Sequence, residues 1–231
     1  MLSAPRFAES AGAEKERQES GAGRSNPARA ARLGGIARSV RRCARCRLAK
    51  SRTHAVPGEG CAQAAIFFVG EAPGQTEDET GRPFVGRAGR EFDELLKLAG
   101  LSREDIFVTG MVKCRPPGNR RPRRDEMRAC RRAHLDRQLD VIQPRLVVLM
   151  GGVAAQETLG AKGLRGVLGR VIERDGRRCF VTYHPAASMR FPTAARTARR
   201  HFRKLSVLLG PRPKARGAAS RCKSMPPAPR R

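Results

Sequence analysis

Short apolar runs alternate with segments of helical spacing along the middle of this chain, and this alternation constrains the fold more than any other feature. Four runs have the composition of buried strands, at residues 65–69, 105–111, 145–150 and 178–183. Helical spacing is found at 89–99, 124–141, 152–159 and 193–209, and 167–173 is placed to form a hairpin with the last strand. Buried strands separated by helices are typical of α/β proteins. We therefore predict a three-layer α/β/α domain with a central four-stranded, mostly parallel sheet.

The two ends of the chain lack this pattern. Residues 1–38 are rich in Ala, Gly, Ser, Arg and Glu without repeated apolar spacing, so we predict a disordered N-terminal extension. Residues 211–231 contain seven Lys or Arg, five Pro and no acid, which predicts a basic disordered tail. The folded domain is then expected to span residues 39–210.

Positive charge points to the class of partner. The chain has 48 Lys and Arg against 21 Asp and Glu, a formal net charge of +27. The two ends account for +3 and +7, which leaves +17 on the predicted domain. So large an excess favours a polyanion such as nucleic acid as the partner. The longest apolar run, 146–155, is shorter than the roughly 18 residues of a membrane span, and no secretory signal is visible, so we expect a cytoplasmic protein without membrane contact.

The segment after the first predicted strand, residues 70–89, combines five glycines and two prolines with four acids. Active sites of parallel sheets lie beyond the carboxyl ends of the strands, which is where this segment begins. Glu71, Glu77 and Asp78 are therefore candidate functional acids, although a solvated loop or helix caps would explain them equally well. Phe84 is either a core residue or a ligand contact.

Four of the seven cysteines have the spacing of a metal site. Cys43 and Cys46 form a C-x2-C pair, and Cys114 and Cys130 follow with 15 residues between them. Four thiolates can hold either zinc or an iron–sulfur cubane. The other three cysteines lack partners at such spacing and are Cys61, Cys179 and Cys222.

A histidine follows the last predicted strand directly. His184 is fixed by Pro185 and lies on the same sheet edge as the acidic segment, which favours a functional role. Met189 and Arg190 come next and place an apolar tip beside a cation. That combination is suited to a wedge inserted into a duplex while the cation holds phosphate.

These motifs together resemble one family. The segment GEAPGQTEDETGRPFVGRAG, the CxxC…KCRPPGN…C spacing and the HPA motif are similar to the family 4 uracil-DNA glycosylases, the iron–sulfur type, over about residues 40–210. The resemblance implies the uracil-DNA glycosylase fold and a monofunctional base-excision repair enzyme that flips uracil out of single- or double-stranded DNA, hydrolyses its N-glycosidic bond and leaves an abasic site. It also implies a [4Fe–4S] cluster on Cys43, Cys46, Cys114 and Cys130.

The resemblance further implies which residues form the site. Phe84 would stack on uracil, His184 would bond a uracil carbonyl, and an acid would stabilise the sugar cation or orient water. The candidate catalytic residues are Glu71, Glu77, His184 and Asn119. The candidate substrate-binding residues are Gly70, Ala72, Asp78, Phe84, Gly110, Met189 and Arg190.

One position departs from the family pattern. Family members usually have Asn in T-N-x-V-K-C, where its side chain reads the uracil edge, whereas this chain has Gly110. Two alternatives therefore stay open: a non-catalytic iron–sulfur nucleic-acid-binding protein, and a glycosylase for another deaminated base such as hypoxanthine or xanthine. We expect a monomer in each case.

Overall fold

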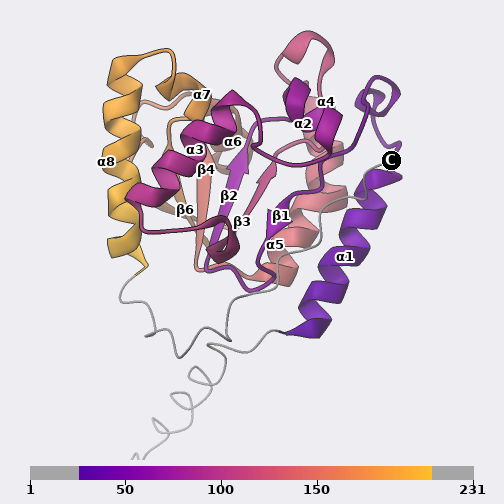
Figure 1. Ribbon diagram of the computed structural model, residues 1–231, viewed down its shortest axis with the longest axis horizontal. Helices are drawn as coiled ribbons and strands as arrows, with labels where there is room; N and C mark the ends of the chain where they lie inside the picture. The colour runs from indigo at the N-terminus through magenta and orange to yellow at the C-terminus, as the bar shows by residue number, and fades with distance from the viewer. Residues whose placement is uncertain (1–25, 210–231) are drawn as a thin grey trace, which may run out of the picture.

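The computed structural model of the chain describes residues 26–209, so the predictions for residues 1–25 and 210–231 lie outside the described part. Its centre is a single sheet with the strand order β1-β3-β2-β4-β6-β5 (Figure 1). The strands are β1 (Glu59–Gly60), β2 (Ile66–Gly70), β3 (Ile106–Gly110), β4 (Leu146–Met150), β5 (Val171–Arg174) and β6 (Arg177–Thr182).

The four predicted strands form the parallel centre of this sheet, β3-β2-β4-β6. Two short strands extend this centre at its edges. Strand β5 pairs antiparallel with β6, which confirms the predicted hairpin, and β1 pairs antiparallel with β3 and was not predicted, so the predicted four-stranded sheet has too few strands. Strand β1 has only two residues, which is too short for a periodic pattern to show in the sequence.

Helices cover both faces of the sheet, as predicted for three layers (Figure 1). Phe67 and Val69 of β2 pack on one face with α1 (Pro27–Arg41), α5 (Asp136–Ile142) and α6 (Gly152–Leu159). Ile66 and Phe68 pack on the other face with α3 (Arg87–Leu98) and α8 (Pro192–Leu208). The remaining helices are α2 (Gln75–Thr80), α4 (Arg124–Cys130), a π-helical turn (Arg131–Leu135) and α7 (Pro185–Ser188), with 3₁₀ turns at Arg47–Lys50, Arg103–Asp105 and Pro117–Asn119. No helix within residues 26–209 is both long and apolar enough to cross a membrane.

Helix α1 corrects the predicted disorder of residues 1–38. The helix begins at Pro27 after Asn26, whose side chain accepts a hydrogen bond from the backbone N–H of Arg29. Leu33, Ile36 and Val40 lie on one face and are buried against the sheet. The surrounding Ala, Gly and Arg residues hide this apolar stripe in the composition, so the folded domain begins well before residue 39.

The segment 70–89 is likewise more ordered than predicted. It contains α2, and α3 already begins at Arg87. Gly74 begins α2 with its backbone N–H bonded to the side chain of Glu77, and Gly81 ends it in the left-handed region at φ 69°. The glycines thus delimit a short helix instead of an irregular loop.

Strand β2 lies between β3 and β4, which follow it in the sequence and lie on opposite sides of it. The chain therefore changes direction at the carboxyl end of β2, and a crevice at such a point is the usual ligand site of an open parallel sheet. Gly70 and Gly110, which end β2 and β3, are register partners there. Two adjacent glycines leave this edge of the sheet without side chains.

We predict that Ile36→Ala lowers the free energy of unfolding by about 2–5 kcal/mol, because the substitution leaves a cavity under α1. The measurement is chemical denaturation followed by circular dichroism. Ser39→Ala is the matched control on the exposed side of the same helix and is expected to change stability by less than about 0.5 kcal/mol. Equal denaturation midpoints for the two variants would contradict the packing of α1.

Candidate functional site

Gly70, Phe84 and His184 meet at the carboxyl edge of the sheet. A Cβ atom on Gly70 would lie 2.6 Å from Cζ of Phe84 and 3.4 Å from Nε2 of His184. The ring centroids of Phe84 and His184 are 5.6 Å apart, with 31° between the ring planes. Two predicted site residues that are 100 positions apart in the sequence therefore face the same glycine, and only a residue without a side chain fits at position 70.

The hydrogen bond of His184 fixes which ring nitrogen carries the proton. Nδ1 accepts the backbone N–H of Ala186 at 3.1 Å, at the start of α7. Burial lowers the pKa of His184 to about 4, a shift that the charge of Glu77 partly opposes. The ring is therefore neutral near pH 7, with its proton on Nε2. This nitrogen faces the Gly70 edge and is a hydrogen-bond donor for a ligand there.

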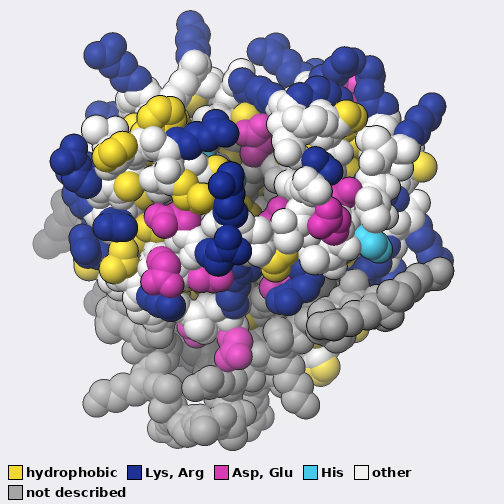
Figure 2. Space-filling view, turned by 45° about the horizontal axis from the view of Figure 1, so that its top comes forward, with side chains coloured by type: hydrophobic (Ala, Val, Ile, Leu, Met, Phe, Trp, Pro, Cys, Tyr) yellow, Lys and Arg dark blue, Asp and Glu magenta, His cyan; other side chains and the backbone are white. Residues whose placement is uncertain are grey.

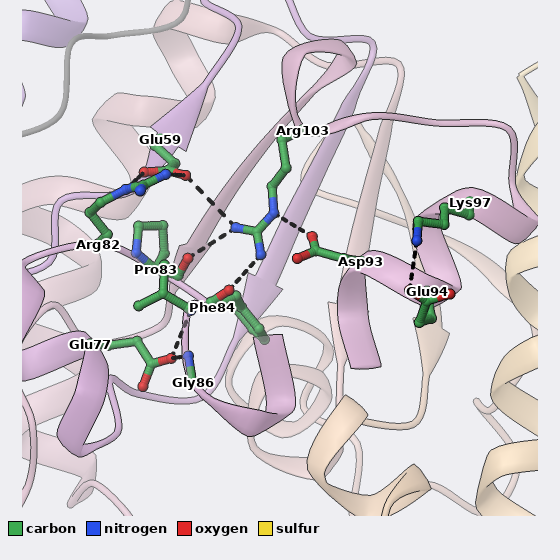
Figure 3. Close-up of polar contacts among 11 residues, drawn as sticks. Glu59, Glu77, Arg82, Pro83, Phe84, Gly86, Asp93, Glu94, Lys97 and Arg103 are labelled. Atoms are coloured by element: carbon green, nitrogen blue, oxygen red, sulfur yellow. Dashed lines mark hydrogen bonds and ion pairs between the residues drawn. The ribbon is translucent and has the colours of Figure 1, made fainter. Parts of the chain in front are cut away.

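The backbone that carries Phe84 is held from two sides (Figure 3). Glu77 accepts the backbone N–H groups of Val85 and Gly86 with Oε1, at 2.9 and 2.8 Å, and that of Gly74 with Oε2 at 3.1 Å. From the other side, Arg103 donates to the carbonyl oxygens of Pro83 and Phe84. These contacts hold Phe84 at φ 54°, a conformation that a side chain of this size rarely adopts.

Two further contacts complete this support. A Cβ on Gly89 would lie 1.9 Å from the carbonyl oxygen of Phe84, so α3 can begin here only with glycine at this position. Arg103 is itself held by Asp93 at 2.6 Å and lies over the ring of Phe92 at 5.4 Å from its centroid. Arg103 could not be predicted from the sequence, because nothing distinguishes it from the other basic residues among the 48 of this chain.

Two predicted site acids hold the backbone around the site. The carboxylate oxygens of Glu77 accept three backbone N–H groups and so position the Phe84 segment. Asp78 is buried, and both its oxygens accept the backbone N–H of Thr53. It anchors the segment that leads from the cysteine pair to β1.

Glu71 follows β2 directly and is the predicted acid that remains available. Burial raises the pKa of this half-buried carboxyl group, while the charge of Arg121 lowers it. Arg121 is exposed and donates to Oε1 of Gln156 on α6. Arg121 belongs to an arginine-rich stretch of the sequence, so its proximity to Glu71 could not be predicted from the sequence.

Gly110 ends β3, and Asn119 lies in the 3₁₀ turn of the loop that follows. Asn119 is exposed, and its side-chain oxygen accepts a hydrogen bond from Nε of Arg115 within the same turn. A Cβ on Gly110 would lie 2.7 Å from the carbonyl oxygen of Val112 and 3.5 Å from Cα of Ala72. A side chain at position 110 therefore requires a shift of the backbone, so the local structure is adapted to glycine.

The edge of the sheet also carries exposed apolar and basic side chains. Met189 and Phe191 are among the most exposed large hydrophobic residues of the described chain, at 45% and 58%, and Arg190 lies between them. They follow α7 directly, on the side of the sheet edge where His184 lies. Figure 2 looks onto this face and shows Lys and Arg side chains projecting around much of its outline. The predicted wedge is thus exposed on a basic surface.

The four spaced cysteines line one pocket of about 280 Å³, although they come from widely separated segments. Cys43 and Cys46 lie between α1 and the first 3₁₀ turn, Cys114 lies in the loop after β3, and Cys130 ends α4. Cys179 is buried in strand β6, Cys61 lies just after β1, and neither lines the pocket. Cys222 lies outside the described residues.

Basic side chains surround these thiols. Arg52 donates to Sγ of Cys114 at 3.1 Å and to the carbonyl oxygen of Cys43 at 2.8 Å. Lys113 is fully buried beside the pocket and donates to Thr109, Gly110 and Gln138. Burial lowers the pKa of Lys113 to about 8, which the charges of Cys130 and Cys114 oppose.

Burial also changes the pKa values of the cysteine thiols that line the pocket. It raises the pKa of the Cys130 thiol to about 12 and raises the pKa of Cys46 and Cys114 as well. Burial thus favours the protonated thiols, and a metal centre that binds them has to displace their protons. Within residues 26–209, no group of three His, Cys, Asp or Glu side chains is arranged to hold a metal ion. Four cysteines beside Arg52 and Lys113 are nevertheless a donor set that a zinc ion or an iron–sulfur cluster accepts.

Comparison with known proteins identifies relatives for most of the chain. The family model of the Uracil DNA glycosylase superfamily matches residues 57–206. A Type-4 uracil-DNA glycosylase of Archaeoglobus fulgidus is 41% identical over 187 residues, which cover 77% of this chain and 94% of the relative. A Type-4 uracil-DNA glycosylase of Sulfurisphaera tokodaii is 40% identical over 75% of this chain and 83% of the relative. A Type-5 uracil-DNA glycosylase of Thermus thermophilus is 36% identical over 48% of this chain and 56% of the relative.

We predict that His184 carries its proton on Nε2 and stays neutral from pH 5.5 to pH 8, because Nδ1 accepts a backbone N–H and burial opposes the charged ring. The measurement is a long-range ¹H–¹⁵N NMR spectrum of protein labelled at histidine, with His184→Ala to assign the signal. A proton on Nδ1, or a change of charge within this pH range, would contradict the prediction.

Proposed function

Because the chain belongs to the uracil-DNA glycosylase superfamily, we propose that it is a monofunctional glycosylase of base-excision repair, which hydrolyses the N-glycosidic bond of uracil in DNA and leaves an abasic site. One observation carries this proposal: the Phe84 ring and Nε2 of His184 face the side-chain-free end of β2, directly beside Glu71. A flat ring and a neutral hydrogen-bond donor at this strand end, with a carboxylate on the next residue of the chain, suit a flipped nucleobase.

Binding is the first step. A base within a duplex is inaccessible, so the uracil nucleotide has to rotate out of the stack into the site. The ring of Phe84 offers a stacking surface, and Nε2 of His184 donates to a uracil carbonyl oxygen. Met189 and Phe191 are the apolar groups placed to fill the gap left in the stack, while Arg190 between them holds a phosphate.

The second step is cleavage of the N-glycosidic bond, in which His184 and Glu71 stabilise the charges that develop on the base and on the sugar. As the bond between C1′ and N1 breaks, its electron pair goes to the base, and the sugar becomes a cation. The neutral His184 stabilises the negative charge that develops on the uracil oxygen. Glu71 in its ionised form stabilises the sugar cation and orients a water molecule, which forms the new bond to C1′ and releases its proton to the carboxylate. The released base anion takes up one proton, and Glu71 gives its proton back to solvent, so the products are uracil and an abasic sugar.

A [4Fe–4S] cluster fits the pocket formed by Cys43, Cys46, Cys114 and Cys130, and we propose it as the resident cofactor. All four thiols line one pocket, and Arg52 and Lys113 lie beside them. When bound, the cluster crosslinks the segment before β1 to the loop after β3 and to α4. The cluster has a structural role in this proposal. We further propose that the enzyme is a monomer and acts in the cytoplasm.

Gly110 bears on which base is removed. The family position that reads uracil has no side chain here, and a Cβ would contact the Val112 carbonyl oxygen. A glycosylase for hypoxanthine or xanthine is the second candidate function, and it requires the same chemistry at Glu71 and His184.

We predict base release from DNA that contains uracil. The test incubates the protein with duplexes carrying uracil, hypoxanthine or no lesion, and then cleaves abasic sites with alkali. Cleavage at uracil supports the proposal, and cleavage at hypoxanthine alone supports the second candidate. Binding that weakens with salt but gives no cleavage would identify a non-catalytic binder. His184→Ala should lower the single-turnover rate by about 100-fold or more without unfolding, because the base anion loses its donor.

We predict that activity is lost as the pH falls through the raised pKa of Glu71, because the acid has to be ionised to orient water. Arg121→Gln removes a cation that lowers this pKa, so the acid limb of the pH–rate profile should move to higher pH. Arg121→Lys keeps the charge and should keep the profile, and Arg203→Gln on the exposed face of α8 is the remote control. An unchanged acid limb in Arg121→Gln would exclude Glu71 as the titrating group.

A further inference from the structure

The cysteine pocket contains a histidine that the function proposed above does not use. His134 lines the pocket together with the four cysteines and is only 1% exposed. Neither Nδ1 nor Nε2 has a hydrogen-bond partner among the described residues. A buried polar group without a partner costs about 1–3 kcal/mol, so nearly all such groups in folded proteins are bonded to something. The missing partner of His134 is therefore expected inside the pocket.

The local helix geometry places this ring beside the cysteines. His134 follows Cys130 by four residues, which brings the two side chains to the same side of a helix. The turn between them, Arg131–Leu135, is π-helical and joins α4 to α5. Isolated π-helical turns are rare in proteins, and those that occur are often found at functional sites. Cys130 is thus followed by a distorted turn whose histidine lines the same pocket.

The lining of the pocket restricts what His134 can bond. An imidazole ring carries at least one N–H in either charge state, so it needs an acceptor. Arg45 and Arg52 of the lining are donors only, and Lys113 already donates to three oxygen atoms elsewhere. Among the side chains that line this pocket, the acceptors that remain are sulfur atoms: the cysteine thiolates and, in a bound cluster, the inorganic sulfides.

We propose that His134 donates its ring N–H to a sulfur atom of the bound cluster, as a positioning residue that retains the cluster and raises its reduction potential. The inference rests on the proposed iron–sulfur cofactor. A hydrogen bond to sulfur withdraws negative charge from the cluster, which favours the reduced form and strengthens the hold of the protein on the cluster. His134 has no part in the chemistry at Glu71 and His184.

The test uses the full chain with its cluster. Iron and sulfide are first quantified in the purified protein, together with the visible absorbance of the cluster. Three variants are then compared with the original chain: His134→Leu removes the N–H at similar volume, His134→Gln restores a donor, and His201→Leu removes another buried histidine. His201 is the matched control because it bonds Thr182 and packs with α8 against the opposite face of the sheet. The measurements are the rate at which an iron chelator bleaches the absorbance and the midpoint potential from a redox titration.

We expect His134→Leu to lose its cluster about 10-fold faster than the original chain and to have a lower midpoint potential, since loss of a contact to a metal ligand typically costs this much in metal retention. His134→Gln should recover most of the loss, and His201→Leu should leave both values unchanged. Equal bleaching rates in His134→Leu and His201→Leu would overturn the inference, as would a glutamine variant no better than leucine. Protein with a colourless zinc centre would overturn the proposed cofactor itself, whatever the variants show.

Discussion

The bonds between the Glu77 carboxylate and three backbone N–H groups are the constraint on which the rest of the site depends. They fold residues 74–86 into a closed segment that starts at the carboxyl end of β2 and returns to the start of α3. Arg103 holds the same backbone from the other side (Figure 3). The absence of a side chain at Gly89 allows α3 to approach this backbone. Phe84 is thereby fixed at a positive φ with its ring against Gly70. Without this segment the histidine after β6 would face an open edge of the sheet, and no stacking surface would exist for a base.

The sheet and the cysteine pocket together fix the position of the Phe84 segment relative to the loop that contains Cys114. The order of the parallel strands places the ends of β2 and β3 side by side, so the Phe84 segment and the loop with Cys114 leave the sheet at neighbouring points. Lys113 joins them, because its ammonium group bonds the carbonyl oxygen of Gly110 at the strand end while it lies beside Cys114 and Cys130. An occupied cysteine pocket therefore supports the edge of the sheet on which the base would rest, without taking part in the reaction.

Much of this architecture could be predicted from the sequence, since buried strands and amphipathic helices leave periodic patterns. The parallel strands, the covering helices and the family were predicted correctly, and the spacing of four cysteines predicted residues that do share a pocket. The errors have local causes. Helix α1 has an apolar stripe of few residues among Ala, Gly and Arg, and β1 is too short to show a pattern. The roles of Glu77, Asp78 and Arg103 depend on which backbone groups come within reach after folding, which spacing alone does not encode.

The central claim is that the ring of Phe84, Nε2 of His184 and the carboxylate of Glu71 surround one flipped base at the end of β2. A crystal structure of the protein with uracil bound, or with DNA carrying a non-cleavable deoxyuridine analogue, tests it most directly. The account predicts the uracil ring stacked on Phe84, a carbonyl oxygen within hydrogen-bond distance of Nε2 of His184, and C1′ of the analogue on the side of Glu71. A base bound elsewhere on the molecule, or one that contacts Phe84 while His184 points away from it, would contradict the account.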